Sequence, residues 1–116
     1  MQEDTFRTHI STKLVGNIQL IPIEDIFYLQ ADHKYVVIKY QKDNQIKEAI
    51  TEESLKSLEL EFQSLFVRIH RNTLVQIKLI EALVKKDSTL FLKLKGCDDL
   101  IEISRRHHAS IRQLIG

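Results

Sequence analysis

The chain consists largely of short segments rich in β-branched, aromatic and other apolar residues, each bounded by a polar turn. Segments of about four to eight residues with this composition are typical of β-strands. The clearest of them are residues 12–15, 18–21, 26–30, 35–40, 45–50, 79–84, 89–94 and 100–103. The sequence therefore predicts a mainly β domain.

The N-terminal part of this pattern also has clear boundaries. Gly16 and Asn17 separate the first two segments and form a two-residue turn typical of a β-hairpin. Pro22, the only proline, is expected to end the second strand, because it has no N–H group to donate to a sheet. Residues 1–11 are then an N-terminal tail or linker remnant, and residues 12–116 are the folded domain.

One helix interrupts the strands in the middle of the chain. Thr51 is its expected N-cap, and two glutamates follow near the positive end of the helix dipole. Apolar residues recur every three or four positions and predict a helix over about residues 52–63, with one buried face made of Leu55, Leu58, Phe62 and Leu65. The opposite face carries Glu59 and Glu61 and would repel phosphate.

A second, short helix is expected at the C-terminus. Ser104 is positioned to cap it, and its apolar positions are Ile111, Leu114 and Ile115. The fold class predicted from the residues is thus mainly β, with a mid-chain helix and a short C-terminal helix.

Composition limits the class of protein further. A chain of 116 residues with 43% hydrophobic residues can bury a core without a metal or a disulfide. Its single cysteine, Cys97, excludes an internal disulfide and indicates a reducing compartment. The N-terminus lacks the apolar stretch of a secretory signal, and every apolar run is too short for a membrane helix. We therefore expect a cytoplasmic protein.

The net charge of +1 conceals an uneven distribution. Up to Phe62 the chain has 7 Lys and Arg against 11 Asp and Glu, and after Phe62 it has 10 against 5. A local excess of positive charge matters more for binding a polyanion than the total does. Charge alone does not separate a nucleic-acid surface from a solvated surface, so the motifs decide.

The most informative motif is Phe-Val-Arg-Ile-His-Arg-Asn at residues 66–72. Alternation points Val67, Ile69 and then Leu74 inward, which leaves Arg68, His70 and Arg71 facing solvent or a partner. Arginine can donate two hydrogen bonds to guanine and asparagine can pair with adenine, so this cluster with Asn72 suits DNA. The structural alternative is that Arg68 or Asn72 caps the local backbone.

Two further polar segments are candidates for the same surface. Ser104, Arg105, Arg106, His107 and His108 lie at the start of the terminal helix, where basic side chains oppose the helix dipole. Together with free backbone N–H groups they form a candidate anion site, although one of the paired histidines is expected to pack.

The other segment is the loop Asp32-His33-Lys34 between two strands. Polar residues are common in such loops, so this segment by itself is a weak indication of function.

Two other function classes remain as alternatives. In a metal-free ribonuclease, His70 and His107 would be the acid–base pair and Arg71 would stabilise charge. A protein-interaction module would instead dock through the acidic helix. The histidines and Cys97 lack the spacing of a zinc site, and three glycines leave no phosphate-binding loop, so we expect no metal and no cofactor. Because Cys97 lies beside two aspartates, its thiol pKa is not expected to be lowered.

Several segments, in this order, resemble the LytTR DNA-binding domain of bacterial response regulators. The similarity extends from about residue 16 to residue 115 and includes residues 23–29, 31–36, 54–59, 66–72 and 103–106. The sequences His-Lys-Tyr-Val at 33–36 and Ser-Arg-Arg-His at 104–107 are most similar to the alginate-regulator branch of that family.

The resemblance implies an elongated sandwich of small antiparallel sheets whose loops enter successive major grooves of promoter DNA. Family members usually bind as two copies on direct repeats. The family's contact positions correspond here to His33 and Lys34, to Arg71, and to Arg105 and Arg106. Some relatives have asparagine or serine in place of Arg71, so the base preference of this chain is its own.

We therefore expect a sequence-specific, non-enzymatic DNA-binding domain of a transcription regulator. Lys34, His70 and Asn72 would mainly contact the DNA backbone, and Arg71 with one of Arg105 and Arg106 would read base edges; His33 and His107 complete the predicted surface. A typical regulator also has an N-terminal receiver domain, which residues 1–11 cannot hold. The chain is thus expected to be an excised effector domain or a stand-alone DNA-binding protein.

Overall fold

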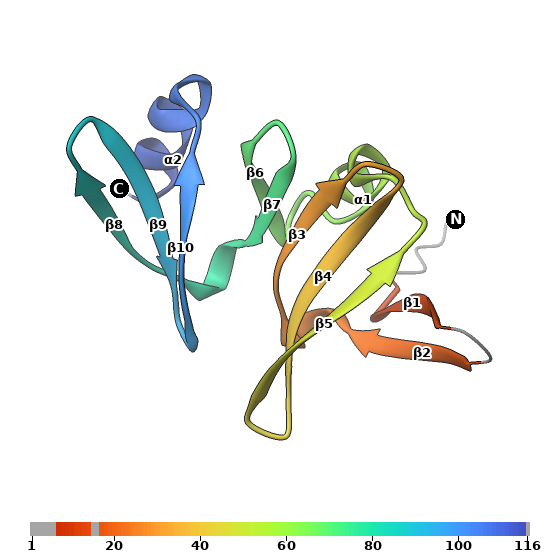
Figure 1. Ribbon diagram of the computed structural model, residues 1–116. Coiled ribbons are helices and arrows are strands. Elements are labelled where there is room, and N and C mark those ends of the chain that lie inside the picture. Colours follow the sequence, from red (N-terminus) through yellow and green to blue (C-terminus); the bar gives the residue numbers. More distant parts are fainter. Residues whose placement is uncertain (1–6, 15–16, 116) are drawn as a thin grey trace.

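The computed structural model describes residues 7–14 and 17–115, and most of these residues lie in short strands (Figure 1). The strands are β1 (His9–Leu14), β2 (Asn17–Pro22), β3 (Ile26–Asp32), β4 (Tyr35–Lys42), β5 (Gln45–Thr51), β6 (Phe66–His70), β7 (Thr73–Gln76), β8 (Ile80–Lys86), β9 (Thr89–Leu94) and β10 (Cys97–Ile103). The helices are α1 (Leu55–Glu61), α2 (His108–Ile115) and the 3-10 turns η1 (Ile23–Asp25), η2 (Ile77–Leu79) and η3 (Arg105–His107).

The strands form three small antiparallel sheets. The largest has the order β5-β4-β3-β7-β6, the second has the order β10-β9-β8, and β1 pairs with β2. The two larger sheets lie beside each other, with the β6–β7 edge of the five-stranded sheet nearest the three-stranded sheet and η2 as the connection (Figure 1). The predicted class, small antiparallel sheets with a mid-chain helix and a short C-terminal helix, is confirmed.

The β6–β7 hairpin separates two hydrophobic cores. On one side Phe66 and Leu74 pack with α1, η1 and the β1–β2 hairpin. On the other side Ile69 and Val75 pack with the three-stranded sheet and with Ile111 of α2. All four residues of β7 are buried, because this strand contributes to both cores. The hairpin is therefore held from two sides.

A polar contact also joins the two larger sheets. The Tyr28 hydroxyl of β3 donates to Asp99 Oδ2 of β10 at 3.0 Å, and Lys39 Nζ of β4 lies 3.5 Å from the same oxygen. Burial and the hydrogen bond to Asp99 raise the pKa of Tyr28 to about 12. The phenol consequently stays protonated and keeps donating at neutral pH.

Helix α1 begins three residues later than predicted, at Leu55. Thr51 is the last residue of β5 and pairs with Val36, so it is not the N-cap. Ser54 has that role, because its Oγ accepts a hydrogen bond from Ser57 N at 3.1 Å. Leu65 lies beyond the helix and is 40% exposed, whereas the other three predicted apolar positions are buried.

The ends of the chain differ from the prediction in a similar way. β1 begins at His9 rather than residue 12, and β10 begins at Cys97 with an irregular register before Leu100. β2 ends at Pro22 as predicted. Val15 and Gly16, on which the end of the first strand and its turn were predicted, lie outside the described residues. In the described part of the chain no helix has the length and apolar character needed to cross a membrane.

Three connections lie at the same end of the molecule. The β3–β4 and β6–β7 turns are adjacent, because β3 pairs with β7 and Ala31 N donates to the Asn72 carbonyl at 2.8 Å. The segment after β10 joins them, because Ser104 N donates to the Ile69 carbonyl at 2.9 Å. In Figure 1 these turns and η3 lie along the upper edge, with α1 beside them.

Candidate nucleic-acid interface

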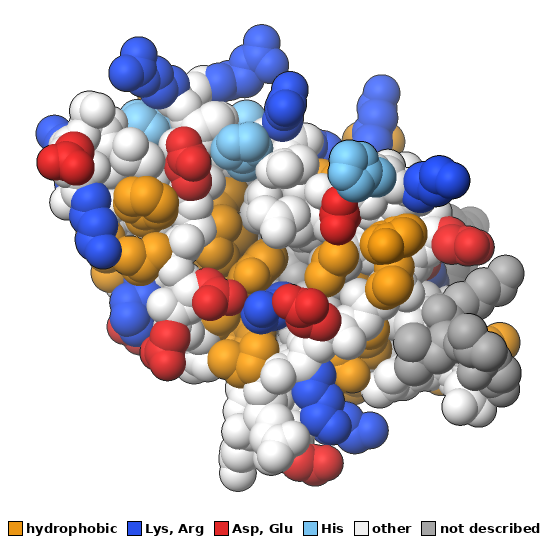
Figure 2. Space-filling model, in the orientation of Figure 1, with side chains coloured by type: hydrophobic (Ala, Val, Ile, Leu, Met, Phe, Trp, Pro, Cys, Tyr) orange, Lys and Arg blue, Asp and Glu red, His pale blue; other side chains and the backbone are white. Residues whose placement is uncertain are grey.

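Lys, Arg and His side chains gather along this upper edge, over α2, the β6–β7 turn and the β3–β4 turn (Figure 2). All eight residues predicted to bind DNA lie on these connections. We use the name basic edge for these eight and one additional lysine described below: His33, Lys34, Lys56, His70, Arg71, Asn72, Arg105, Arg106 and His107.

His33 and Lys34 form the tip of the β3–β4 hairpin, between the paired residues Asp32 and Tyr35. His33 has φ 54°, a left-handed conformation that histidine adopts more readily than most residues. Its side chain is 94% exposed, and Lys34 is exposed as well. Both side chains are therefore accessible to a large partner.

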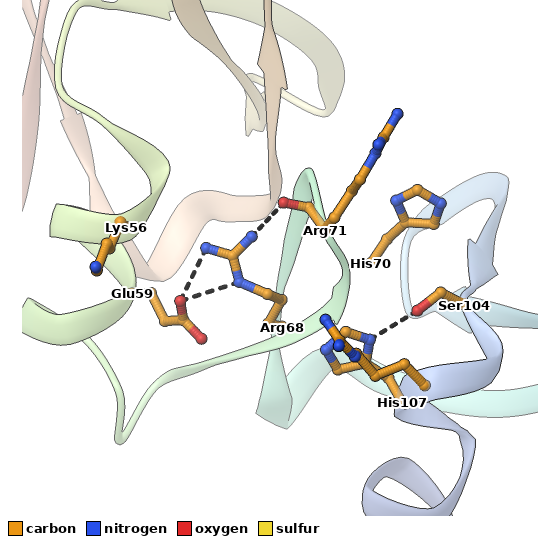
Figure 3. A pocket seen from close by; sticks show the side chains of 8 residues that line it. Lys56, Glu59, Arg68, His70, Arg71, Ser104 and His107 are labelled. Atoms are coloured by element: carbon orange, nitrogen blue, oxygen red, sulfur yellow. Dashed lines mark hydrogen bonds and ion pairs between the residues drawn. The ribbon is translucent and has the colours of Figure 1, made fainter.

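The β6–β7 turn presents Arg71 at its tip. Arg71 is exposed, and its guanidinium points away from the protein (Figure 3). The Asn72 side chain is partly held, because its Oδ1 accepts from Thr73 Oγ1 at 2.9 Å. Its amide nitrogen is the remaining donor of the side chain.

Arg68 does not face solvent, contrary to the prediction. Its side chain is only 20% exposed, and its Nε and Nη2 donate to Glu59 Oε1 at 3.0 and 2.8 Å. Its Nη1 donates to the Arg71 carbonyl (Figure 3). The structural alternative, a cap on the local backbone, is therefore correct for Arg68.

His70 lies at the end of β6, where the register shifts between Arg68 and His70. Its Nδ1 is buried and has no hydrogen-bond partner among the described residues. Buried polar atoms are nearly always paired, so such an exception marks a site that needs an explanation. His70 borders the pocket described below.

The segment after β10 carries two exposed arginines, Arg105 and Arg106, in η3. Ser104 does not cap through its side chain, contrary to the prediction, because its Oγ bonds to His107 Nδ1 at 2.7 Å. His108 packs as expected of one of the pair, with its Nε2 3.1 Å from the Ile103 carbonyl.

A pocket of about 710 Å³ lies where these connections meet α1 (Figure 3). Its lining residues come from α1, the β6–β7 turn and the segment after β10, and they are Lys56, Glu59, Arg68, His70, Arg71, Ser104, Arg106 and His107. Lys56 was not among the predicted site residues, because the polar face of α1 was expected to be acidic. An indication was present in Lys56 itself, three residues before Glu59 and therefore on the same side of the helix.

Both acidic residues of that helix face are ion-paired. Glu59 is neutralised by Arg68 at 2.8 Å, and Glu61 Oε1 lies 2.6 Å from Arg7 Nη2. The predicted repulsion of phosphate by this face is thereby reduced, because each carboxylate has a cation in contact. Exposed Lys56 adds a positive charge beside Glu59.

His107 has a pKa below its ordinary value. The main cause is burial, and the positive charges of Arg106 and Arg68 and the neighbouring His70 act in the same direction, against Glu59. His107 is accordingly neutral at pH 7.

This shift predicts that the domain loses stability as the pH falls. Below about pH 6.5 the unfolded chain binds a proton at His107 before the folded chain does, so the free energy of unfolding decreases as the pH falls further. Urea unfolding at several pH values measures this effect. The free energy of unfolding of His107→Gln is expected to decrease less on acidification than that of the parent. The control is His33→Asn, because His33 is exposed and outside the pocket. Equal pH profiles for His107→Gln and the parent would contradict the prediction.

The other groups considered as reactive or metal-binding are the remaining histidines, the acidic residues and Cys97. Within residues 7–14 and 17–115, no three His, Cys, Asp or Glu residues are grouped as metal ligands. Cys97 is buried, and burial raises the pKa of its thiol, in agreement with an unreactive cysteine.

Comparisons with known proteins agree with the fold. Residues 16–116 match the family profile described as the LytTr DNA-binding domain. The chain is 44% identical over 111 residues to the positive alginate biosynthesis regulatory protein of Pseudomonas aeruginosa. The matched region is 94% of this chain and 43% of that protein. It is also 28% identical over 103 residues to a heme-containing CO-sensing transcriptional regulator of Paraburkholderia xenovorans. That matched region is 87% of this chain and 37% of that protein.

A solved structure shows the same architecture. It is the LytTr DNA-binding domain of a methyl-accepting/DNA response regulator from Bacillus cereus, with a TM-score of 0.80 at 20% identity. The match covers 95% of this chain and 98% of that one. The chain spans less than half the length of the curated relatives.

Proposed function

This chain belongs to the LytTR DNA-binding domain family, whose function is sequence-specific DNA binding in transcription regulation, and we propose that the basic edge is its surface for double-stranded promoter DNA. The observation that carries the proposal is the convergence of connections from distant parts of the sequence. Backbone hydrogen bonds from Ala31 to Asn72 and from Ser104 to Ile69 hold them together. A rigid base of this kind is what sequence reading by loops requires.

The exposed arginines are the candidates for reading bases. Arg71 projects from the β6–β7 turn, and Arg105 and Arg106 are exposed in η3, so each can donate two hydrogen bonds to guanine in the major groove. His33, Lys34, His70, Asn72 and His107 would contact phosphates or add to base contacts. Because α1 and α2 have only seven and eight residues, the turns rather than a long recognition helix would enter the groove.

The organisation of the whole regulator is also part of the proposal. The matched region is less than half of each curated relative, and we infer a cytoplasmic regulator in which a receiver domain controls this DNA-binding domain. The domain would extend from the start of β1 at His9 rather than from the predicted residue 12, because Ile10 is fully buried in the first core. Two copies would bind direct repeats in a promoter.

In vitro selection tests the proposal. The chain is incubated with a library of randomised duplexes, and bound duplexes are amplified and sequenced. We expect a recurring motif, tighter binding to that motif than to a scrambled duplex of the same base composition, and affinity that falls steeply with salt. Equal binding to the selected and the scrambled duplex would contradict sequence-specific recognition.

Phosphate contacts are tested separately by Lys34→Ala and Lys56→Ala. Each variant is expected to weaken binding to selected and scrambled duplexes by the same factor. Each should also lower the slope of log K against log salt by about 1, because one fewer counterion is released. Lys42→Ala is the control, since Lys42 is exposed at the β4–β5 turn, the opposite end of the same sheet. Unchanged slopes for both test variants would remove α1 and the β3–β4 turn from the interface.

A further inference from the structure

Glu59 is the only acidic side chain among the described residues that line the pocket. A carboxylate on a surface that meets phosphates weakens DNA binding by repulsion. Glu59 nevertheless lies within a group of cations, where a favourable effect can offset this repulsion. The contacts of Arg68 with Glu59 and with the β6–β7 turn provide it.

The Arg68 guanidinium joins α1 to the β6–β7 turn. Two of its nitrogens donate to Glu59 Oε1, at 3.0 and 2.8 Å, and a third donates to the Arg71 carbonyl. The guanidinium is planar and its donors point in fixed directions. Its contacts with Glu59 and with the Arg71 carbonyl are therefore geometrically coupled. The Glu59 carboxylate thereby orients a group bonded to the backbone of Arg71 (Figure 3).

Regular strand pairing is interrupted at the base of the β6–β7 turn. The register of β6 against β7 is irregular between Arg68 and His70, so the regular ladder of strand hydrogen bonds is interrupted just before the turn. Arg71 itself is exposed and points away from the protein. The backbone under its side chain is consequently held by Arg68 from one side and by the contact of Asn72 with Ala31 from the other.

The same pairing also removes a charge from the interface. Arg68 is bound to Glu59 and only 20% exposed, so it contributes little to sequence-independent attraction of phosphate. Without Glu59 its Nε and Nη2 would lose their acceptor and could donate to the phosphates of any duplex.

From these contacts we infer that Glu59 and Arg68 are positioning residues that increase the sequence specificity of Arg71 and limit binding to other DNA. This inference rests on the proposed function and concerns its selectivity. Specificity is a difference between two affinities, and the pair acts on both.

The test measures the affinity of Glu59→Gln and Arg68→Lys for the duplex selected by the parent chain and for a scrambled duplex. Glu59→Gln is expected to bind the scrambled duplex more tightly, with a salt slope larger by about one unit. Its ratio of selected to scrambled affinity should fall at least about fivefold. Arg68→Lys keeps the charge but loses the planar donors, so the ratio should fall without a gain on the scrambled duplex.

Glu81→Gln is the matched control. Glu81 is ion-paired with Lys93 at 3.2 Å in the three-stranded sheet, so this change removes the same charge away from the pocket. It should leave the ratio unchanged. The double variant Glu59→Gln/Arg68→Lys is expected to lose no more specificity than the larger single loss, because both residues act through one connection.

Different outcomes would contradict the inference and the proposed function. A parent chain that discriminates, with both variants retaining its ratio, overturns the inference and leaves the proposed function standing. Equal weakening on both duplexes also overturns it, because that is the effect of a merely structural pair. A parent chain that does not discriminate at all contradicts the proposed function and the inference with it.

Discussion

Replacing Ile69 by alanine is expected to lower the free energy of unfolding by about 2–5 kcal/mol, the usual cost of removing a large buried aliphatic side chain. Ile69 is fully buried in the core shared by β6, the three-stranded sheet and Ile111 of α2. Alanine would leave a cavity where these three elements meet. Urea unfolding followed by circular dichroism measures the effect.

Ile18→Ala is the matched control for this prediction. Ile18 lies on β2 and is 73% exposed, so its loss should change stability by no more than about 0.5 kcal/mol. A cost for Ile69→Ala as small as that for Ile18→Ala would mean that the second core contributes little to stability. A large cost shows that packing between β6, the three-stranded sheet and α2 stabilises the domain.

Replacing Arg71 or Arg106 by alanine is expected to weaken binding to the selected duplex by about 1–3 kcal/mol each, roughly 5- to 150-fold. The reason is the loss of a pair of charge-assisted hydrogen bonds to one base. Binding to a scrambled duplex should change much less, because no base contact is lost there. Titrations with labelled duplexes at one salt concentration measure both affinities.

A repeat of the selection with each variant shows where specificity is lost. Arg71→Ala and Arg106→Ala should each relax the motif at one position, and at different positions. Lys95→Ala is the control, because Lys95 is exposed at the β9–β10 turn, the opposite end of its sheet from η3. If both arginine variants bind the selected duplex as tightly as the parent does, the basic edge is not the DNA-binding surface.

Most strands could be predicted because each is a short apolar segment between polar turns, and this pattern is local. The start of α1 could not, because Thr51 and Ser54 are both good N-cap residues. The choice between them was made by the pairing of Thr51 with Val36, a contact between distant residues. The cap of the C-terminal helix was wrong for a similar reason, since the Ser104 hydroxyl is used by His107.

In the candidate site, too, the residues governed by local pattern were predicted and those governed by distant contacts were not. Arg71, Arg105 and Arg106 were predicted to be exposed from local pattern, and they are. Arg68 was misplaced because its partner, Glu59, lies on another element nine residues earlier. Lys56 was missed because only the packed structure shows which side of α1 faces the β6–β7 turn.

By itself, the sequence determined the mainly β class, the family and the exposed basic turns, because strand periodicity and turn composition act over a few neighbouring residues. The tertiary structure alone decided which charges act together. The acidic first part of the chain contributes Lys34 and Lys56 to the basic edge, while Glu59 and Glu61 of the same part are paired with arginines. Electrostatic interactions depend on distance in space rather than along the chain, so charge counts could not reveal this arrangement.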